Sequence, residues 1–397
     1  MQDFGRRLKW IRTSRTRRNI GVVEKPGLPR ILALDNLRGL SAIYVVAFHT
    51  AFVPYPQLYV PPLLVNFVRF GSTGVYLFFI ISGFSLSLTM PRHSASQSPS
   101  LSYTLSRFFR IAPLFYSLLI LTLLRDWILF QAHHSVKEIL GSVFFIFNFA
   151  PRHQEGIVSA SWTIGVEMVY YCLFPIFYRF PLKAKLVLVA SAAALHCSLI
   201  WIFGGSGILR LLFLGFIPIF IFGEMTFKLA SACHDNIHAR RRAPLVTMCG
   251  AGILLYCIMN PGRVEPFSSG VIPELFRIAS GLGYSLVLFG LILRPVRIFE
   301  NRIFGFYGKI SYSLYLCHPT IVYLLSRPYR WVYKIVPGSL AYLVCVCLTM
   351  TIVTGIATIT YRFIEKPSIR LGHNLLQFLI ASRNTRKSAR KSALSAV

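Results

Sequence analysis

Apolar stretches almost free of charge recur along the whole chain. A helix needs about 20 apolar residues to cross the hydrocarbon core of a bilayer, and residues 71–90 contain no charged residue at all. Such stretches predict an all-α fold, a polytopic membrane helix bundle with about ten transmembrane helices. The expected spans are residues 39–53, 71–90, 111–124, 161–178, 186–203, 208–227, 244–260, 276–293, 303–325 and 336–361.

The overall composition agrees with a membrane protein. Only 14% of the 397 residues are charged, whereas a soluble domain carries about 25%. A soluble chain of this length would form about two or three domains, but the apolar stretches favour one membrane domain at residues 31–370. We expect it to lie between a basic N-terminal arm, residues 1–30, and a basic C-terminal tail, residues 371–397.

The net charge of +29 has two interpretations, nucleic-acid binding and membrane topology. Basic residues concentrate in the short cytoplasmic loops of membrane proteins. If residues 139–150 form a re-entrant or interfacial piece, because they are too few to span, 32 of the 42 lysines and arginines fall on one side. This asymmetry favours a multi-pass protein of the cell membrane with both termini cytoplasmic. Its partner would be the lipid bilayer and not nucleic acid.

The sequence contains no motif for a metal or a nucleotide cofactor. The eight cysteines form no CxxC pair and mostly lie in apolar runs, where cysteine behaves as a small hydrophobic residue. HExxH and P-loop sequences are also absent. We therefore expect no bound cofactor and no metal.

Ionisable residues inside spans are costly in lipid, so they mark candidate functional sites. Arg38 and His49 bracket the first span, eleven residues apart, which places them on nearly the same helical face, about 16 Å from each other. A neutral imidazole at that depth can accept and return a proton near neutral pH. The same histidine could equally be a core residue bonded to a backbone carbonyl. Glu224, near the end of its span, is expected close to headgroups.

Two arginines precede the third span with RxxR spacing. Arg107 and Arg110 therefore share one helical face. Such a pair can clamp phosphates, or it can anchor the cytoplasmic end of the helix. Taken alone, the spacing favours the anchor.

Polar and aromatic residues mark the outer ends of two later spans. Glu167 could orient His49, bind a sugar hydroxyl or pair with an arginine. Trp162 could stack on a sugar ring. Tyr315 and His318 belong to a polar, aromatic strip that would suit sugar hydroxyls or, alternatively, an interfacial aromatic belt with a proline kink.

Six short motifs follow one another in this membrane domain. They are LDNLRGLSA at 34–42 with His49 after it, GVYLFFIISGF at 74–84, RFFR at 107–110, SWTIGVE at 161–167, SYSLYLCH at 311–318 and YRFIEKP at 361–367. In this order they resemble the acyltransferase type 3 family of membrane-bound O-acyltransferases, which decorate bacterial polysaccharides. Thr163 stands where serine is commoner in that family.

The resemblance implies ten helices and transfer of an acyl group, often acetyl, from a cytoplasmic coenzyme A thioester. His49 would act as the catalytic base or carry the acyl group, supported by Arg38 and Glu167. The phosphates of acyl-CoA would bind Arg38, Arg107 and Arg110. Acyl-CoA would be a donor substrate and not a bound cofactor.

The acceptor implied by the resemblance is a hydroxyl of a carbohydrate or glycolipid, held from the outer side by Trp162, Tyr315 and His318. The alternative function is a polytopic transporter or flippase for a lipid-linked sugar or organic acid, because buried His, Glu and Arg would serve it equally well. Transporters often contain internal repeats, and none is visible in this sequence.

The charge asymmetry makes a testable prediction about topology. A cysteine introduced into the C-terminal tail should stay unlabelled when intact cells are treated with a membrane-impermeant maleimide, because the tail is expected to be cytoplasmic. Labelling should appear only after the membrane is permeabilised. Labelling of intact cells would overturn the predicted orientation.

Overall fold

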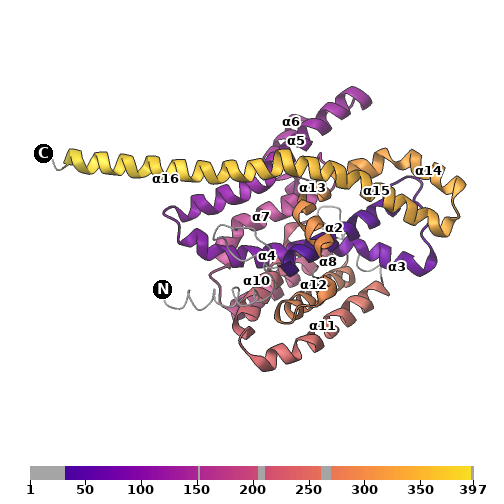
Figure 1. Cartoon of the computed structure of the whole chain (residues 1–397), viewed down its shortest axis with the longest axis horizontal. Helices are drawn as coiled ribbons and strands as arrows, with labels where there is room; N and C mark the ends of the chain where they lie inside the picture. The colour runs from indigo at the N-terminus through magenta and orange to yellow at the C-terminus, as the bar shows by residue number, and fades with distance from the viewer. Residues whose placement is uncertain (1–31, 151–152, 204–210, 261–269, 300, 395–397) are drawn as a thin grey trace.

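The computed structural model describes residues 32–150, 153–203, 211–260, 270–299 and 301–394. The predicted N-terminal arm lies outside these ranges. Within them the chain forms helices and no β-strand, and most of the helices gather into one bundle (Figure 1). The predicted fold class, an all-α membrane helix bundle, is confirmed.

The α-helices are α2 (Leu32–Phe52), α3 (Pro62–Phe70), α4 (Gly74–Ser94), α5 (Pro99–Phe130), α6 (Val136–Val143), α7 (Trp162–Phe177), α8 (Leu182–Phe203), α10 (Ile217–Cys233), α11 (Ile237–Ile258), α12 (Val271–Leu293), α13 (Arg302–Leu324), α14 (Ser326–Ile335), α15 (Gly338–Thr360) and α16 (Lys366–Leu394). The short turns are the 3₁₀ helices η1 (Gly71–Thr73), η2 (Phe147–Phe149), η3 (Phe213–Phe216) and η5 (Arg297–Phe299), and the π-helix η6 (Tyr361–Glu365).

Seven helical stretches among the described residues are long and apolar enough to cross a membrane. They coincide with seven of the ten predicted spans. The other three predicted spans coincide with α2, α7 and α13, of which α7 is apolar but only 16 residues long. Ten membrane crossings therefore stay a prediction, although every predicted span overlaps a helix.

Helices at the periphery of the bundle bury one stripe only. In α8 the buried residues are Lys185, Ala192, His196 and Ile200, whose spacings of seven and four place them on one face. The opposite faces of α8 expose large apolar side chains such as Trp201, which is 82% exposed. An apolar outer surface of this kind is expected where lipid tails surround a helix.

Helices α2 and α13 pack against each other at glycines. A Cβ atom added at Gly39 would lie 2.3 Å from the carbonyl oxygen of Phe304, and one added at Gly308 would lie 1.9 Å from that of Asp35. No side chain fits between the two backbones there, so both positions require glycine. The contact fixes the register of α2 against α13.

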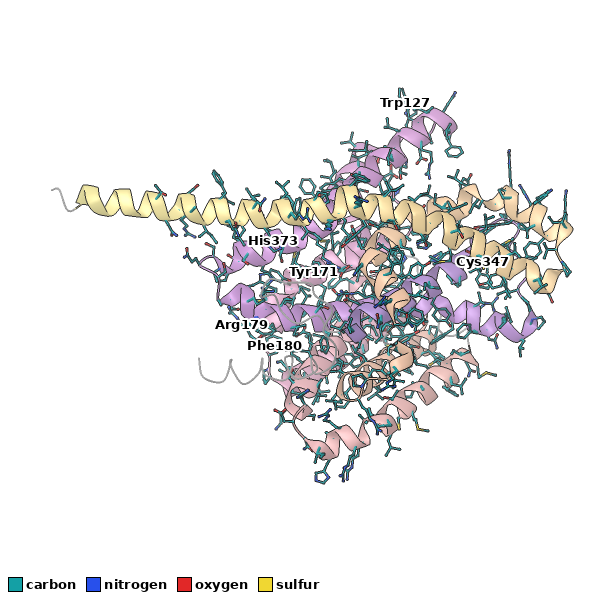
Figure 2. All side chains as sticks on the ribbon, in the orientation of Figure 1. Trp127, Tyr171, Arg179, Phe180, Cys347 and His373 are labelled. Atoms are coloured by element: carbon teal, nitrogen blue, oxygen red, sulfur yellow. The ribbon has the colours of Figure 1, made fainter. Side chains whose placement is uncertain are left out.

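Three segments depart from a simple bundle. Helix α5 has 32 residues, more than a bilayer needs, and its far end carries Trp127 away from the other helices (Figure 2). Helix α6 has only eight residues, so the stretch at 139–150 forms no helix long enough to span the bilayer. Helix α16 continues from α15 through η6 and projects beyond the bundle, so the predicted C-terminal tail is helical as far as Leu394 (Figure 1).

The sequence predicts Glu224 at the lipid headgroups, but the structure places its side chain in the protein interior. Its side chain is fully buried and accepts hydrogen bonds from Lys185 Nζ and Tyr170 Oη. Lys185 is also fully buried and donates to the Phe177 carbonyl oxygen at 2.5 Å. The two opposite charges satisfy each other where lipid could solvate neither. This ion pair links α8 to α10.

We expect Gly308→Val to destabilise the bundle, because the valine side chain would collide with the backbone of α2. Overpacking of this kind costs about 1–3 kcal/mol and should lower the apparent unfolding temperature of the purified protein in detergent. Gly355→Val is the matched control, since a Cβ atom at Gly355 meets nothing within 4 Å. Equal unfolding temperatures for the two variants would contradict the close packing of α2 and α13.

Candidate active site

Two histidines from distant parts of the sequence meet inside the bundle. His318 Nε2 lies 3.1 Å from His49 Nδ1, and the ring centroids are 4.8 Å apart. His49 Nδ1 is also 2.9 Å from the Val45 carbonyl oxygen, and His318 Nδ1 is 2.6 Å from the Tyr315 carbonyl oxygen. His318 is fully buried, whereas His49 is partly exposed. The candidate catalytic histidine therefore has a second histidine as its direct neighbour.

A cavity of about 820 Å³ opens beside His49. Its aromatic lining is Phe48, Phe52, Phe130, Trp162 and Tyr323, and its charged lining is Arg69, Arg125, Asp126 and Glu155. These residues come from the later parts of α2, α5 and α13, from the end of α3, from the start of α7 and from the connection between α6 and α7. A mixture of apolar faces and a few charged groups suits a ligand that presents both kinds of surface.

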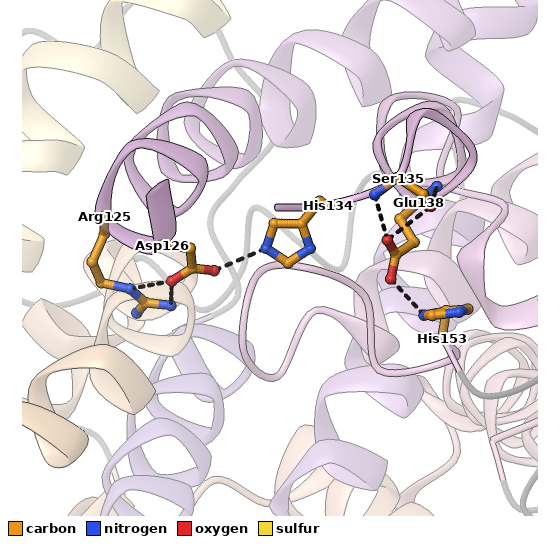
Figure 3. Close-up of polar contacts among 6 residues, drawn as sticks. All are labelled: Arg125, Asp126, His134, Ser135, Glu138 and His153. Carbon is orange, nitrogen blue, oxygen red and sulfur yellow. Dashed lines mark hydrogen bonds and ion pairs between the residues drawn. The ribbon is translucent and has the colours of Figure 1, made fainter. Parts of the chain in front are cut away.

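A polar network holds the segment between α5 and α7, which forms part of the cavity wall (Figure 3). Asp126 accepts hydrogen bonds from Arg125 Nε at 2.8 Å and from His134 Nε2 at 2.9 Å. Further along, Glu138 belongs to the capping box that starts α6 and pairs with His153 at 2.7 Å. The first contact ties the start of the segment to α5, and the second joins α6 to the loop that precedes α7.

The three arginines predicted to bind phosphate, Arg38, Arg107 and Arg110, form a second polar group, separate from the histidine pair. We call this group the arginine layer, and the two groups together the two polar layers. Arg38 Nη2 donates a hydrogen bond to Ser85 Oγ at 2.9 Å, and Arg38 lies near enough to Arg110 for the two charges to repel each other. Arg107 lies over the ring of Tyr171, 5.9 Å from its centroid. All three arginine residues are partly exposed.

Glu167 belongs to this arginine layer and not to the histidine pair. Ser82 Oγ donates to Glu167 Oε1 at 2.6 Å, and Tyr171 Oη donates to the same oxygen at 2.5 Å. The carboxylate also attracts Arg38. Neither of the described hydrogen bonds reaches His49. Of the three hypothesised roles of Glu167, the geometry therefore favours pairing with an arginine.

A buried carboxylate that the sequence analysis did not select, Glu365, completes the arginine layer. It is 3% exposed, accepts a hydrogen bond from Ser313 Oγ at 2.8 Å, and attracts Arg110 and Arg38. It ends the π-helix η6, a local widening that is frequent at functional sites. The YRFIEKP motif contains this residue, but the sequence could not show its neighbours, since Ser313 is 52 positions away.

Trp162 and Tyr315 support the cavity wall from two helices. Trp162 lines the cavity but is only 5% exposed, with its ring centroid 5.3 Å from that of Phe216. The Tyr315 hydroxyl accepts from Thr163 Oγ1 at 3.0 Å and donates to the Ala160 carbonyl oxygen at 3.3 Å. Ala160 has a φ of 60°, a left-handed conformation that costs about 1–2 kcal/mol. Tyr315 thus stabilises a strained turn in the cavity wall.

Helix α2 connects the two polar layers. Eleven residues separate Arg38 from His49, which corresponds to about 16 Å along a helix. The side chains available for chemistry are imidazole, guanidinium and carboxylate groups. Among the described residues, no three His, Cys, Asp or Glu side chains gather as a metal site.

Known proteins similar to this chain carry the name O-acetyltransferase. The O-acetyltransferase OatA of Staphylococcus aureus strain NCTC 8325 is 23% identical over 405 residues, which cover 90% of this chain and 60% of the relative. A protein of Staphylococcus aureus strain COL with the provisional name O-acetyltransferase is 21% identical and covers 88% of this chain and 59% of its own length. No solved structure matches the chain significantly.

The match to a protein family extends over most of the chain, whereas each motif covers only a few residues. The chain spans about three fifths of the length of the curated relatives that it matches. The family model described as the acyltransferase domain matches residues 31–359, a range that contains the histidine pair and the three arginines. This chain belongs to that acyltransferase family.

Proposed function

We propose that this acyltransferase moves an acetyl group from cytoplasmic acetyl-CoA to a hydroxyl of a carbohydrate or glycolipid. The observation that supports the proposal best is the position of His49, which lines the cavity and shares a helix with Arg38. The cavity would take the acceptor, and the arginine layer would take the phosphates of the donor. The names of the O-acetyltransferase relatives agree with this type of transfer.

In the proposed mechanism His49 is the general base. The acceptor hydroxyl gives its proton to the free imidazole nitrogen while its oxygen attacks the carbonyl carbon of the acetyl thioester. The carbon–sulfur bond then breaks, the sulfur leaves as a thiolate, and the imidazolium returns the proton to it. The products are an acetyl ester and the coenzyme A thiol. A route in which the imidazole first carries the acetyl group uses the same residue and the same two substrates.

The arginine layer suits the donor because coenzyme A carries several phosphates. A guanidinium group can donate two parallel hydrogen bonds to one phosphate. Arg38 and Arg110 have Glu167 and Glu365 as electrostatic partners, which would hold them in place before the donor binds. The thin pantetheine arm would then extend over the roughly 16 Å from Arg38 to His49. Donor entry from the cytoplasm agrees with the excess of basic residues expected on that side.

We expect His49→Gln to abolish O-acetylation, because glutamine keeps a hydrogen bond but takes no proton at neutral pH. Ester-bound acetate, released by mild base from the glycans of cells that carry only this variant, should fall by about 10²–10⁴-fold. Thr50→Val is the matched control, since it removes a buried hydroxyl on the same helix that bonds to Thr349. If His49→Gln keeps half or more of wild-type acetylation at equal membrane abundance, the assignment is wrong.

Arg110→Ala should weaken binding of acetyl-CoA by about tenfold or more, since a hydrogen bond to a charged group contributes about 1.5–3 kcal/mol. Arg110→Lys should restore the affinity only in part, because an ammonium group lacks the forked geometry. Titration calorimetry of the purified protein with acetyl-CoA measures both values. The control is Arg179→Ala, which alters an exposed arginine just past the end of α7. Equal affinities in all variants would reduce Arg110 to a topological anchor.

A further inference from the structure

We propose that His318 is a positioning residue that holds His49 in the tautomer able to act as a base toward the cavity. This inference rests on the proposed function, since it concerns the same transfer step. The family resemblance implies a substrate contact for His318, but its side chain is fully buried. It also lies outside the lining of the cavity, which His49 does line.

The tautomer of His318 follows from its shortest contact. Its Nδ1 lies 2.6 Å from the carbonyl oxygen of Tyr315, and a carbonyl oxygen can only accept a hydrogen bond. Nδ1 must therefore carry a proton. A charged imidazolium is costly at a fully buried position, so the ring is neutral. Its Nε2 then carries a lone pair.

The tautomer of His49 follows from that of His318. His49 Nδ1 faces two acceptors, the Val45 carbonyl oxygen at 2.9 Å and the His318 Nε2 lone pair at 3.1 Å. A proton on His49 Nδ1 can be shared between these two acceptors in one hydrogen bond. A lone pair on His49 Nδ1 would instead face the lone pairs of both acceptors and be repelled by them. The proton therefore lies on Nδ1, and His49 Nε2 is the basic nitrogen. Among the described residues, no protein group forms a hydrogen bond with His49 Nε2.

The same contact stabilises the charge that develops during transfer. When His49 Nε2 takes the proton of the acceptor hydroxyl, the ring becomes an imidazolium and Nδ1–H remains a donor. Its hydrogen bond to His318 then joins a charged donor to a neutral acceptor, and such bonds are roughly twice as strong as neutral ones. His318 acts by orientation and charge stabilisation and exchanges no proton itself. A catalytic base oriented by a third group is the general pattern of such sites.

The direct test is a ¹⁵N NMR spectrum of histidine-labelled protein in lipid nanodiscs, where protonated and unprotonated ring nitrogens give separate signals. The difference from the spectrum of His49→Gln assigns the signals of His49. We expect the Nδ1–H tautomer in the wild type and in His318→Gln, because the glutamine oxygen can accept the same hydrogen bond. In His318→Leu we expect a second, Nε2–H population. A wild-type His49 with its proton on Nε2 would overturn the proposal.

A kinetic test separates positioning from substrate contact. Coenzyme A release from acetyl-CoA is followed with methyl glucoside as the added acceptor and water as the background acceptor. His318→Leu should lower kcat on the order of 10²-fold, while the KM values for acetyl-CoA and methyl glucoside change less than about threefold. His318→Gln should restore most of kcat. Cys317→Ala, a change at an equally buried neighbour on α13, should leave both parameters unchanged.

Two kinetic results would overturn the inference. If His318→Gln is as inactive as His318→Leu at normal membrane abundance, the imidazole itself transfers a proton. If His318→Leu raises KM for methyl glucoside and leaves kcat unchanged, the residue contacts substrate. The activity of His49→Gln tests the proposed function separately. If this variant is active, the proposed function is wrong. If it is inactive and only the His318 results fail, the proposed function still holds.

Discussion

The approach of α2 to α13 without intervening side chains determines where the candidate site forms. Gly39 and Gly308 let the two backbones touch, and helices are stiff enough to carry that register along their length. His49 lies ten residues after Gly39, and His318 lies ten residues after Gly308. On neighbouring helices that run in the same direction, equal offsets of about 15 Å bring the two imidazoles to the same level. The histidine contact is therefore a consequence of the glycine contact.

Exposure distinguishes the charges that hold the bundle from those that could bind a ligand. On the periphery, Glu274 contacts Arg277 Nη1 at 2.6 Å and His196 Nδ1 at 3.0 Å, and all three side chains are at most 3% exposed. This group links α8 to α12. Arg38 and Arg110 also have acidic partners, but both remain partly exposed. The arginine layer is the better candidate for phosphate binding, because its residues are partly exposed and guanidinium groups suit phosphate.

In the proposed mechanism the two polar layers, which α2 connects, bind different substrates. Donor phosphates would stay with the arginines, and the acceptor would stay in the cavity beside His49, so only the acetyl group and the pantetheine arm need to pass between the helices. The buried support around the cavity would keep its wall in place during the reaction, because Tyr315 fixes the turn at Ala160 and Phe216 packs against Trp162. Preorganised groups of this kind cost no rearrangement at the moment of transfer.

The sequence by itself determined the helices and drew attention to most of the residues of the candidate site. The length of an apolar stretch can be read directly from the sequence, so each predicted span overlaps a helix. Arg38 and His49 stand out for the same reason, because a charge or an imidazole inside an apolar stretch is visible in the sequence without the fold. Only the tertiary structure decided the partners. His318 is 269 positions from His49, and the sequence showed neither Glu365 beside the arginines nor the burial of Glu224. Contacts between helices depend on how their faces pack, and no pattern within one helix specifies which distant side chain will meet it.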